Sequence, residues 1–512
     1  MRIGFRLDAG DVVGLGHFFR CLSIGEAFSD LGNEVYFLSR NLPVWLREIA
    51  RERGVGLAEI TSGGSGFRLR EDGATSNRLS LSDSSQTLVV SKALGLDLLL
   101  VDHYGIDQVW FTNLEKKGLR LLQIADFPAF KGGDFLLDYG FDASLAKHNI
   151  SKASAQGLLL GPKFAPVYFA PSRPSERVSP EVSGSRPRVS IALGSAVSAS
   201  FLESVEAEYL DSARDFSLAI VARDNSREKS NVNGVQWVEP SDGLGGLFAG
   251  SDFTVTSGGV SMYERIAHGI PGLVVETAKN QRAALEALRE GGLGDDTLTE
   301  LKDVTPKSLL QTIGRKLSLG RDSAQSLLLK SKVDFYGPLR VAFSLGAVGF
   351  SGTLVGRRFE PKDSPLLLNW ANDPVVRANS ISLQKVSPEA HILWQKNIRS
   401  KGTQIWVFDY QGIPFGQVRF ESEHGKTFVS YSIDSIFRGL RLSKEMVSIA
   451  MRKASIHDDI FAKAKPTNTA SIRVLIALGF SISSTRGDLI TLRLSKHQNS
   501  KNIHPAPKSL DT

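Results

Sequence analysis

The chain has almost no cysteine: among its 512 residues only Cys21 carries a thiol. A single thiol forms no intrachain disulfide, and this composition is typical of a reducing compartment. No apolar run approaches the length of about 18 to 20 residues that a membrane-spanning helix needs. Met1 leads directly into a strand-like segment without the apolar core of a signal peptide. We therefore expect a cytoplasmic protein with no membrane partner.

Runs of like charge are also missing. The formal net charge is +7, yet the lysines and arginines are scattered and no run of five or more basic residues occurs. This pattern does not support a nucleic-acid interface, whereas local cations suffice for a small polyanion such as a nucleotide. No Asp-x-Asp motif appears, and we expect no bound metal. At this length, two to four globular domains are expected.

What the sequence does contain is alternating strand and helix patterns. Strand-like segments at 2–7, 34–40 and 96–105 alternate with helical segments at 16–32 and 42–54, and a second such series begins near residue 187. Continuous apolar strands suit parallel sheets that are buried on both faces. The Gly-, Ser- and Asp-rich stretch 61–86 is predicted to be a mobile loop. The fold class predicted is α/β, with two doubly wound Rossmann-like domains facing each other across a cleft.

The composition changes after about residue 355, which indicates a third, α+β domain. Residues 364–380 are predicted to form one helix, 403–421 a hairpin and 442–455 an amphipathic helix. The predicted domain limits are 1–165, 166–345 and 346–495, followed by a disordered tail at 496–512.

The first strand-to-helix turn carries a concentration of chemical groups: Asp8, Gly14, Gly16, His17 and Arg20. Ligands of doubly wound sheets lie beyond the carboxyl ends of the strands, and paired glycines let backbone approach a ligand. Phe19 occupies the third glycine position of a dinucleotide motif, which argues against that motif. Arg20 near His17 favours a neutral imidazole that can act as a base. The alternative is a tight turn with a surface histidine.

A second group of polar residues ends a buried strand: Asp102, His103 and Tyr104. In the predicted topology they share the cleft with His17. The alternative assigns Asp102 to a helix N-cap and leaves His103 in solvent.

The segment 251–281 gives the strongest signal in this half of the chain. A strand ends in Ser257, Gly258 and Gly259, a helix starts near Ser261, and Glu264 lies one turn further on. Exposed amides at a helix start bind phosphate, and a carboxylate accepts hydrogen bonds from ribose hydroxyls. After the next strand come Asn280 and Gln281.

The stretch "SGGVSMYE…HGIPGLVVETAKNQ" resembles the nucleotide-sugar-binding half of GT-B enzymes. With "GDVVGLGHFFRCL" and "VDHYGID", the first ~340 residues resemble the UDP-2,4-diacetamido-2,4,6-trideoxy-β-L-altropyranose hydrolases of pseudaminic acid biosynthesis. The resemblance implies a GT-B arrangement in which water attacks the anomeric carbon of a UDP-sugar. It implies that His17 is the catalytic base. It also implies that the substrate is contacted by Asp8, Gly14, Gly16, Arg20, Asp102, His103, Tyr104, Ser257, Gly258, Gly259, Ser261, Glu264, Asn280 and Gln281.

One departure bears on the substrate. The first strand of the second domain ends in residues 194–197, Gly-Ser-Ala-Val, where the family has Gly-Gly-x-Asp. The acidic residue is missing, so a related UDP-sugar is left open as the substrate.

In the third domain, "FRGLRLS" resembles the pyrophosphate loop of GNAT-type N-acyltransferases, and "NTASIRVLIALGF" resembles their last strand-helix segment. "LLNWANDPVVRANS" (367–380) resembles the opening helix of GNAT enzymes that acetylate amino sugars. A lone "FRGL" would instead indicate a surface turn, but three segments occur in order. The resemblance implies acetyl-CoA as co-substrate, held by Arg438, Gly439, Arg441, Leu442, Ser443 and Asn468.

Two residues depart from the GNAT pattern. Arg441 stands at a glycine position of the loop, and Leu475 stands where many relatives have a tyrosine that protonates the departing thiolate. Glu421 and Asp434 are weak candidates for a general base.

Together the resemblances imply a bifunctional nucleotide-sugar enzyme of nonulosonic, pseudaminic-type acid biosynthesis. It would N-acetylate a UDP-linked 4-amino sugar with acetyl-CoA and hydrolyse UDP from the diacetamido product. The alternative is a GT-B glycosyltransferase that uses a UDP-sugar and carries a degenerate GNAT module for binding or assembly.

Overall fold

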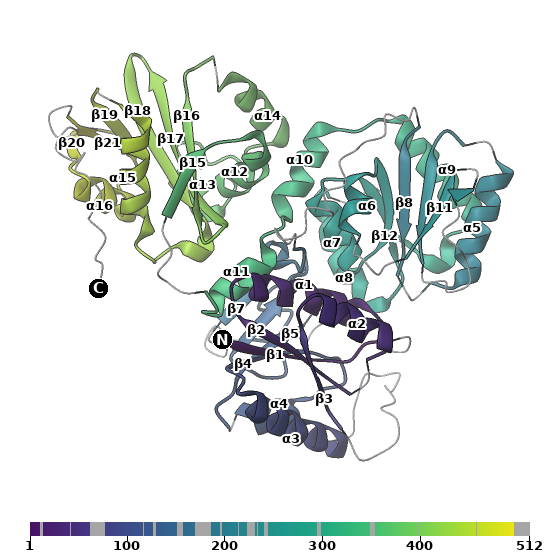
Figure 1. The fold of residues 1–512 in the computed structure, drawn as a ribbon. Helices are drawn as coiled ribbons and strands as arrows, with labels where there is room; N and C mark the ends of the chain where they lie inside the picture. Colours follow the sequence, from purple (N-terminus) through teal and green to yellow (C-terminus); the bar gives the residue numbers. More distant parts are fainter. Residues whose placement is uncertain are drawn as a thin grey trace. The chain divides into compact units, whose positions relative to one another are not determined.

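The computed structural model describes residues 1–10, 14–40, 42–61, 77–115, 117–125, 130–150, 157–168, 186–194, 197–212, 214–222, 231–232, 234–239, 244–293, 298–348, 354–398, 400–456 and 458–495. The chain divides into two compact units, residues 1–348 and residues 349–512 (Figure 1). The predicted tail at 496–512 lies outside the described residues. Within the described residues, no helix combines the length and apolar character needed to cross a bilayer.

The first sheet is parallel throughout, with strand order β3-β2-β1-β4-β5-β6-β7. Its strands are β1 (Arg2–Leu7), β2 (Glu34–Ser39), β3 (Gly56–Glu59), β4 (Leu98–Asp102), β5 (Arg120–Ile124), β6 (Phe135–Asp138) and β7 (Gly157–Leu160). The helices that connect them are α1 (Gly16–Asp30), α2 (Val44–Glu52), α3 (Asn77–Leu94) and α4 (Gln108–Glu115). The chain runs outward in one direction from β1 and in the other from β4, so the topological switch point lies between these two strands.

The prediction of a loop over 61–86 is wrong for its last ten residues, because α3 begins at Asn77. The buried side chains on its inner face are polar: Asp83, Ser84, Thr87 and Ser91. They recur at the spacing of a helix, but they give no hydrophobic period. Residues 62–76 of that stretch lie outside the described residues.

The second sheet has the order β10-β11-β9-β8-β12-β13-β14, and only β10 is antiparallel to its neighbour. Its strands are β8 (Arg188–Ala192), β9 (Ser217–Val221), β10 (Asn231–Val232), β11 (Val235–Val238), β12 (Phe253–Ser257), β13 (Gly272–Glu276) and β14 (Leu298–Glu300). Its helices are α5 (Ala199–Asp211), α6 (Gly245–Ala249), α7 (Val260–Ala267), α8 (Arg282–Glu290), α9 (Pro306–Ser318) and α10 (Ser323–Lys332). Its switch point lies between β8 and β12.

The last helix of this unit, α11 (Gly337–Ser344), returns to the first sheet and packs on α1 and on the short helix η1 (Pro162–Phe164). Arg340 is fully buried there, with Nη1 donating to the Lys163 carbonyl at 3.0 Å and both terminal nitrogens binding Asp334 at 2.6 Å. Gly337 lies against the backbone of Ala165 so closely that a Cβ would stand 2.1 Å from its carbonyl oxygen.

The third sheet is mixed, with order β15-β16-β17-β18-β19-β21-β20. Its strands are β15 (Leu354–Arg358), β16 (Gln404–Tyr410), β17 (Ile413–Glu423), β18 (Lys426–Ile433), β19 (Ile460–Ala464), β20 (Ser481–Arg486) and β21 (Leu489–Leu494). The helices are α12 (Ser364–Ala371), α13 (Pro374–Asn379), α14 (Pro388–Asn397), α15 (Leu442–Ala454) and α16 (Thr469–Ala477). The predicted fold class, two doubly wound α/β sheets followed by an α+β domain with a mixed sheet, is confirmed.

The single helix predicted over 364–380 is wrong, because two helices form. Asp373 separates them and caps α13, since its Oδ1 accepts from the amides of Val375 at 2.9 Å and Val376 at 3.0 Å. Pro374 follows directly, and a residue before proline is disfavoured in helical conformation. The break therefore follows from a capping residue and a proline in sequence.

Candidate functional site

His17 and Asp102 meet at the switch point of the first sheet. His17 is the second residue of α1, which follows β1, and Asp102 ends the neighbouring strand β4. Nδ1 of His17 lies 2.7 Å from Oδ1 of Asp102, and both side chains are buried. Nη2 of Arg20 also lies 3.0 Å from this nitrogen, but the Asp102 oxygen is closer and can only accept, so we assign the proton to Nδ1. The lone pair that can accept a proton is therefore on Nε2.

Arg20 clamps the same carboxylate. Its Nε and Nη2 both donate to Asp102, and its Nη1 donates to the hydroxyl of Tyr139 at 2.9 Å. Burial alone would raise the pKa of Asp102, but Arg20 and then His17 outweigh burial and hold that pKa well below its ordinary value. Asp102 is thus an anion at neutral pH and orients His17, while Arg20 is occupied in holding Asp102.

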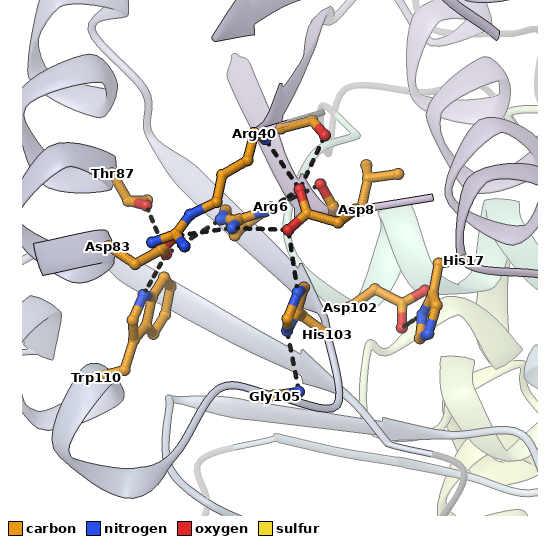
Figure 2. A network of polar contacts seen from close by, with 12 residues as sticks. Arg6, Asp8, His17, Arg40, Asp83, Thr87, Asp102, His103, Gly105 and Trp110 are labelled. Carbon is orange, nitrogen blue, oxygen red and sulfur yellow. Dashed lines mark hydrogen bonds and ion pairs between the residues drawn. The ribbon is translucent and has the colours of Figure 1, made fainter. Parts of the chain in front are cut away.

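Asp8 and His103 belong to a neighbouring buried network (Figure 2). Oδ1 of Asp8 accepts from the Ser39 hydroxyl at 2.9 Å, and Oδ2 lies 3.1 Å from Nε2 of His103. Nδ1 of His103 accepts from the Gly105 amide at 3.0 Å, which places the proton on Nε2. Burial lowers the pKa of His103, so the ring is neutral at neutral pH. These contacts fix the turn that follows β4.

Four members of this network were missed by the sequence reasoning: Arg6, Arg40, Asp83 and Trp110. Arg6 is fully buried in β1 and binds Asp8 at 2.9 Å and Asp83 at 2.7 Å. Asp83 also pairs with Arg40 at 2.6 Å and accepts from Nε1 of Trp110 at 2.8 Å (Figure 2). Buried charges are retained where they are paired, and this pairing ties α3 to the ends of β1 and β2.

Tyr104 lies directly against the His17 ring, edge to face, with centroids 4.5 Å apart. The backbone around it is held by Nζ of Lys131, which donates to the carbonyls of Tyr104 at 3.0 Å and Ile106 at 2.6 Å. In the turn before α1, Gly14 has φ +88°, a conformation that favours glycine. The space beside Gly16 is open, since a Cβ there would meet nothing within 4 Å.

The predicted nucleotide segment lies at the switch point of the second sheet. β12 ends at Ser257, and α7 begins at Val260 without a side-chain cap, so the amides of its first turn are not satisfied by an N-cap side chain. Ser261 Oγ donates to the carbonyl of Ala192, at the end of β8, at 3.5 Å. Glu264 is half-buried on α7.

Gln281 ties two loops of this segment together. Its Oε1 accepts from the amide of Gly258 at 3.3 Å and from the amide of Thr277 at 3.0 Å, and its side chain packs on Gly258. This arrangement gives Gln281 a positioning role. The side chain of Asn280, together with residues 195 and 196 of the departing turn, lies outside what the structure describes.

Tyr263 connects α7 with the His17 cluster. Its ring contacts Tyr139 edge to face at 5.1 Å and stacks on Phe141 at 5.6 Å. Tyr139 also receives the hydrogen bond from Arg20. α7, the helix of the predicted nucleotide segment, is thus linked through Tyr263 and Tyr139 to Arg20, which binds Asp102.

In the second unit, β18 and β19 pair at only two positions, Thr427 with Ile460 and Phe428 with Phe461. β18 continues to Ile433, so its later backbone groups have no partner on β19. The turn at 438–441 follows, and α15 begins at Leu442. We use the name slot for the part of β18 that does not pair with β19, residues 429–433, together with the start of α15. Unpaired backbone groups and a helix N-terminus suit an extended chain that ends in phosphates.

The residues predicted to hold acetyl-CoA take different positions at this slot. Gly439 has φ +85° and is exposed, and Leu442 and Ser443 open α15. Arg438 forms an ion pair with Asp373 at 2.7 Å, and its Nε donates to the Ile433 carbonyl at 3.2 Å, so it anchors the turn. Asn468 caps α16 by accepting from the Ser471 amide at 3.3 Å.

The two weak base candidates are both engaged. Asp434 is buried, and its oxygens accept from Nε1 of Trp370 at 3.0 Å and from the Ile436 amide at 3.1 Å. Glu421 pairs with Arg419 at 3.2 Å. Asp434 therefore shapes the turn before α15.

Arg441 is the N-cap of α15 and has φ +63° and ψ 18°, the left-handed conformation that glycine adopts without strain. The backbone thus keeps the glycine conformation at the position where the sequence departs from the GNAT pattern. The exposed side chain adds a cation at a helix start.

We expect Arg441→Gly to be more stable than Arg441→Ala by about 1 kcal/mol, because both lose the charge and only alanine keeps the left-handed strain. Chemical denaturation of the two variants measures this difference directly. If the Arg441 cation attracts a pyrophosphate, both variants should weaken acetyl-CoA binding by a similar factor in calorimetric titration. Equal stabilities would contradict the strain, and unchanged affinities would contradict the cation's role.

Among the described residues, no group of three or more His, Cys, Asp or Glu side chains is arranged to hold a metal ion. The polar clusters of both units are built from carboxylates paired with arginine, lysine or histidine.

Over 413 residues, 77% of this chain and 78% of the other, the chain is 19% identical to an uncharacterized protein of Methanocaldococcus jannaschii. A solved glycosyltransferase of kitacinnamycin is similar at 15% identity and a TM-score of 0.49, covering 68% of this chain and 99% of that one. A spermidine N-acetyltransferase from Vibrio cholerae, in complex with CoA and spermine, is similar at 15% identity and a TM-score of 0.26, covering 29% and 98%. Residues 354–481 match the acetyltransferase (GNAT) domain family, and the C-terminal part of the chain is therefore a GNAT acetyltransferase domain.

Proposed function

We propose that residues 1–348 hydrolyse a UDP-sugar, with His17 as the general base. The observation that carries this proposal is the buried pair of His17 and Asp102, which leaves the Nε2 lone pair to accept a proton. Nε2 takes a proton from water, the water oxygen bonds to the anomeric carbon, and the bond from that carbon to the UDP oxygen breaks. Tyr104 packs on the His17 ring and keeps it in place.

The leaving group would be bound at the start of α7. The amides after Gly258 and Gly259 lie at a helix N-terminus, which favours the negative charge that grows on departing UDP. Glu264 on the same helix would accept hydrogen bonds from the ribose hydroxyls. Both switch points thus contribute, one to the water and sugar and one to the nucleotide.

The substrate proposed is a UDP-2,4-diacetamido-2,4,6-trideoxy sugar. Its proposed origin is the second unit, whose GNAT domain would transfer the acetyl group of acetyl-CoA to the amine of a UDP-linked 4-amino sugar. The slot and the turn at Gly439 suit a pantetheine chain and its pyrophosphate. The two activities would then act in succession within nonulosonic acid biosynthesis.

The deciding experiment incubates the full chain with the diacetamido UDP-sugar and no acceptor, and follows UDP by a coupled assay. Release of UDP with free sugar as the second product supports the hydrolase. Release that occurs only when a sugar or lipid acceptor is added would make the protein a glycosyltransferase.

The acetyltransferase is tested separately. Acetyl-CoA is titrated into the full chain, and acetylation of a UDP-4-amino sugar is followed by mass spectrometry. Absence of saturable acetyl-CoA binding would leave the GNAT domain as a binding or assembly module.

A further inference from the structure

Acetyl transfer from a thioester expels a thiolate, whose conjugate thiol has a pKa near 8.5 in a model cysteine. A protonated group beside the sulfur therefore speeds the step near neutral pH. Leu475 on α16 offers no such proton, and its side chain is buried. A proton donor for the sulfur would therefore have to be another side chain that brings a hydroxyl to α16.

Tyr431 lies on the part of β18 that β19 has left. The last paired residue of β18 is Phe428, and Tyr431 follows three positions later, opposite Val418 of β17. It therefore belongs to the slot in which the proposed thioester would lie.

The face of the sheet on which Tyr431 lies follows from the alternation along β18. Its neighbour Ser430 accepts from Nε of Arg419 at 3.3 Å, and the Arg419 guanidinium lies 5.6 Å from the ring centroid of Trp394 on α14. Successive residues of a strand point to opposite faces. Tyr431 therefore points away from α14.

On that face the Tyr431 side chain interacts with Ser471 of α16. Ser471 and Leu475 are four residues apart, so they occupy the same face of this helix. The Tyr431 hydroxyl thus reaches the helix face on which a hydroxyl at position 475 would stand. Burial raises the pKa of Tyr431, more than the Ser471 contact lowers it, so the phenol keeps its proton at neutral pH.

We propose that Tyr431 is a catalytic residue of the acetyl transfer and protonates the departing sulfur, a role that rests on the acetyltransferase activity proposed above. The amine nitrogen bonds to the acetyl carbon, the carbon–sulfur bond breaks, and the phenolic proton goes to the sulfur. The phenolate then recovers a proton that the acetylated amine has lost, by way of solvent. No further reactant is needed.

The test uses the full chain with acetyl-CoA and a UDP-4-amino sugar, and compares wild type with Tyr431→Phe. We expect kcat to fall on the order of 10²-fold, with KM for acetyl-CoA changed by less than about twofold. The decline of wild-type kcat at high pH, where the phenol ionises, should be absent in the variant. Tyr410→Phe, a buried tyrosine on β16 of the same sheet, is the matched control and should keep wild-type kcat.

Each outcome distinguishes this proposal from the proposed function. If wild type acetylates the sugar and Tyr431→Phe does so equally well, Tyr431 is not the acid and the acetyltransferase stands. A rise in KM with kcat and its pH profile unchanged would assign Tyr431 to packing of the slot and overturn the proposal. If wild type neither binds acetyl-CoA nor transfers acetyl, the acetyltransferase itself falls, and with it the role of Tyr431.

Discussion

Replacing His17 with alanine is expected to lower kcat for UDP release by a factor of about 10² to 10⁴, the usual contribution of a positioned base. The buried imidazole is oriented by Asp102, so its removal takes away the proposed proton acceptor at the switch point. KM should change little, because the base acts on water and its role is confined to the transition state. Steady-state assays of UDP release with the purified full chain measure both quantities.

His424→Ala provides the control for this variant, since His424 is an exposed residue of the GNAT hairpin between β17 and β18. It should hydrolyse the UDP-sugar at the wild-type rate. Wild-type kcat in His17→Ala, in a chain that melts at the wild-type temperature, would remove His17 from the mechanism.

Asp102→Asn examines the same pair from the other side. The carboxamide can donate to Nδ1, which would move the imidazole proton to Nε2 and take away the lone pair that accepts a proton from water. We expect a loss of kcat comparable to that of His17→Ala, and little further loss in the double variant. Additive losses would show that Asp102 acts independently of His17.

The largest stability effect is expected at Arg6. Arg6→Met should lower the free energy of unfolding of the first unit by about 3 to 5 kcal/mol, because it leaves buried carboxylates without their main partner. Both Asp8 and Asp83 are buried and bind the guanidinium directly. Urea denaturation followed by circular dichroism measures the change. Arg2→Met is the matched control. Arg2 lies on the same strand as Arg6 but forms an exposed ion pair with Glu34 of β2, so this variant should change the free energy of unfolding by less than about 1 kcal/mol.

The loss of unfolding free energy caused by Arg6→Met, here called the deficit, should depend on pH because of His103. In the wild type, burial first and then Arg6 lower the pKa of His103 below the ordinary value of 6.5, while Asp8 opposes them. The unfolded chain binds that proton more readily, so the wild type loses stability as pH falls below about 6.5. Without Arg6 the imidazole can protonate beside Asp8, and this loss shrinks. The deficit should therefore be smaller at pH 5.5 than at pH 8, and an equal deficit at both would exclude His103 as the compensating group.

The sequence predicted those parts of the fold that bury apolar side chains at a regular period. β4 is an almost continuous apolar strand, and β1 and β12 are buried along nearly their whole length, as expected for parallel strands covered on both faces. α3 escaped because its buried face is polar and is stabilised by Arg6 and Arg40 from other segments. A buried polar face of this kind can be recognised only when its partners from other segments are known, because it leaves no hydrophobic period in the local sequence.

The site follows the same division. His17 and Asp102 were both predicted because polar residues that end adjacent parallel strands come together at one edge of the sheet. Their hydrogen bond and the clamp by Arg20 depend on side-chain conformations that spacing does not encode. Arg438 illustrates the converse, since its ion pair with Asp373, a residue distant in sequence, is a role in the turn that spacing does not predict.

The return of α11 to the first sheet has a consequence for folding during synthesis. The last strand of that sheet is complete at Leu160, yet the helix that packs on α1 and η1 ends at Ser344. While the ribosome makes the intervening residues, the surface of α1 that α11 will cover remains open to water and to other chains. The packing around the first sheet is therefore completed only after the residues of the second sheet have been synthesised.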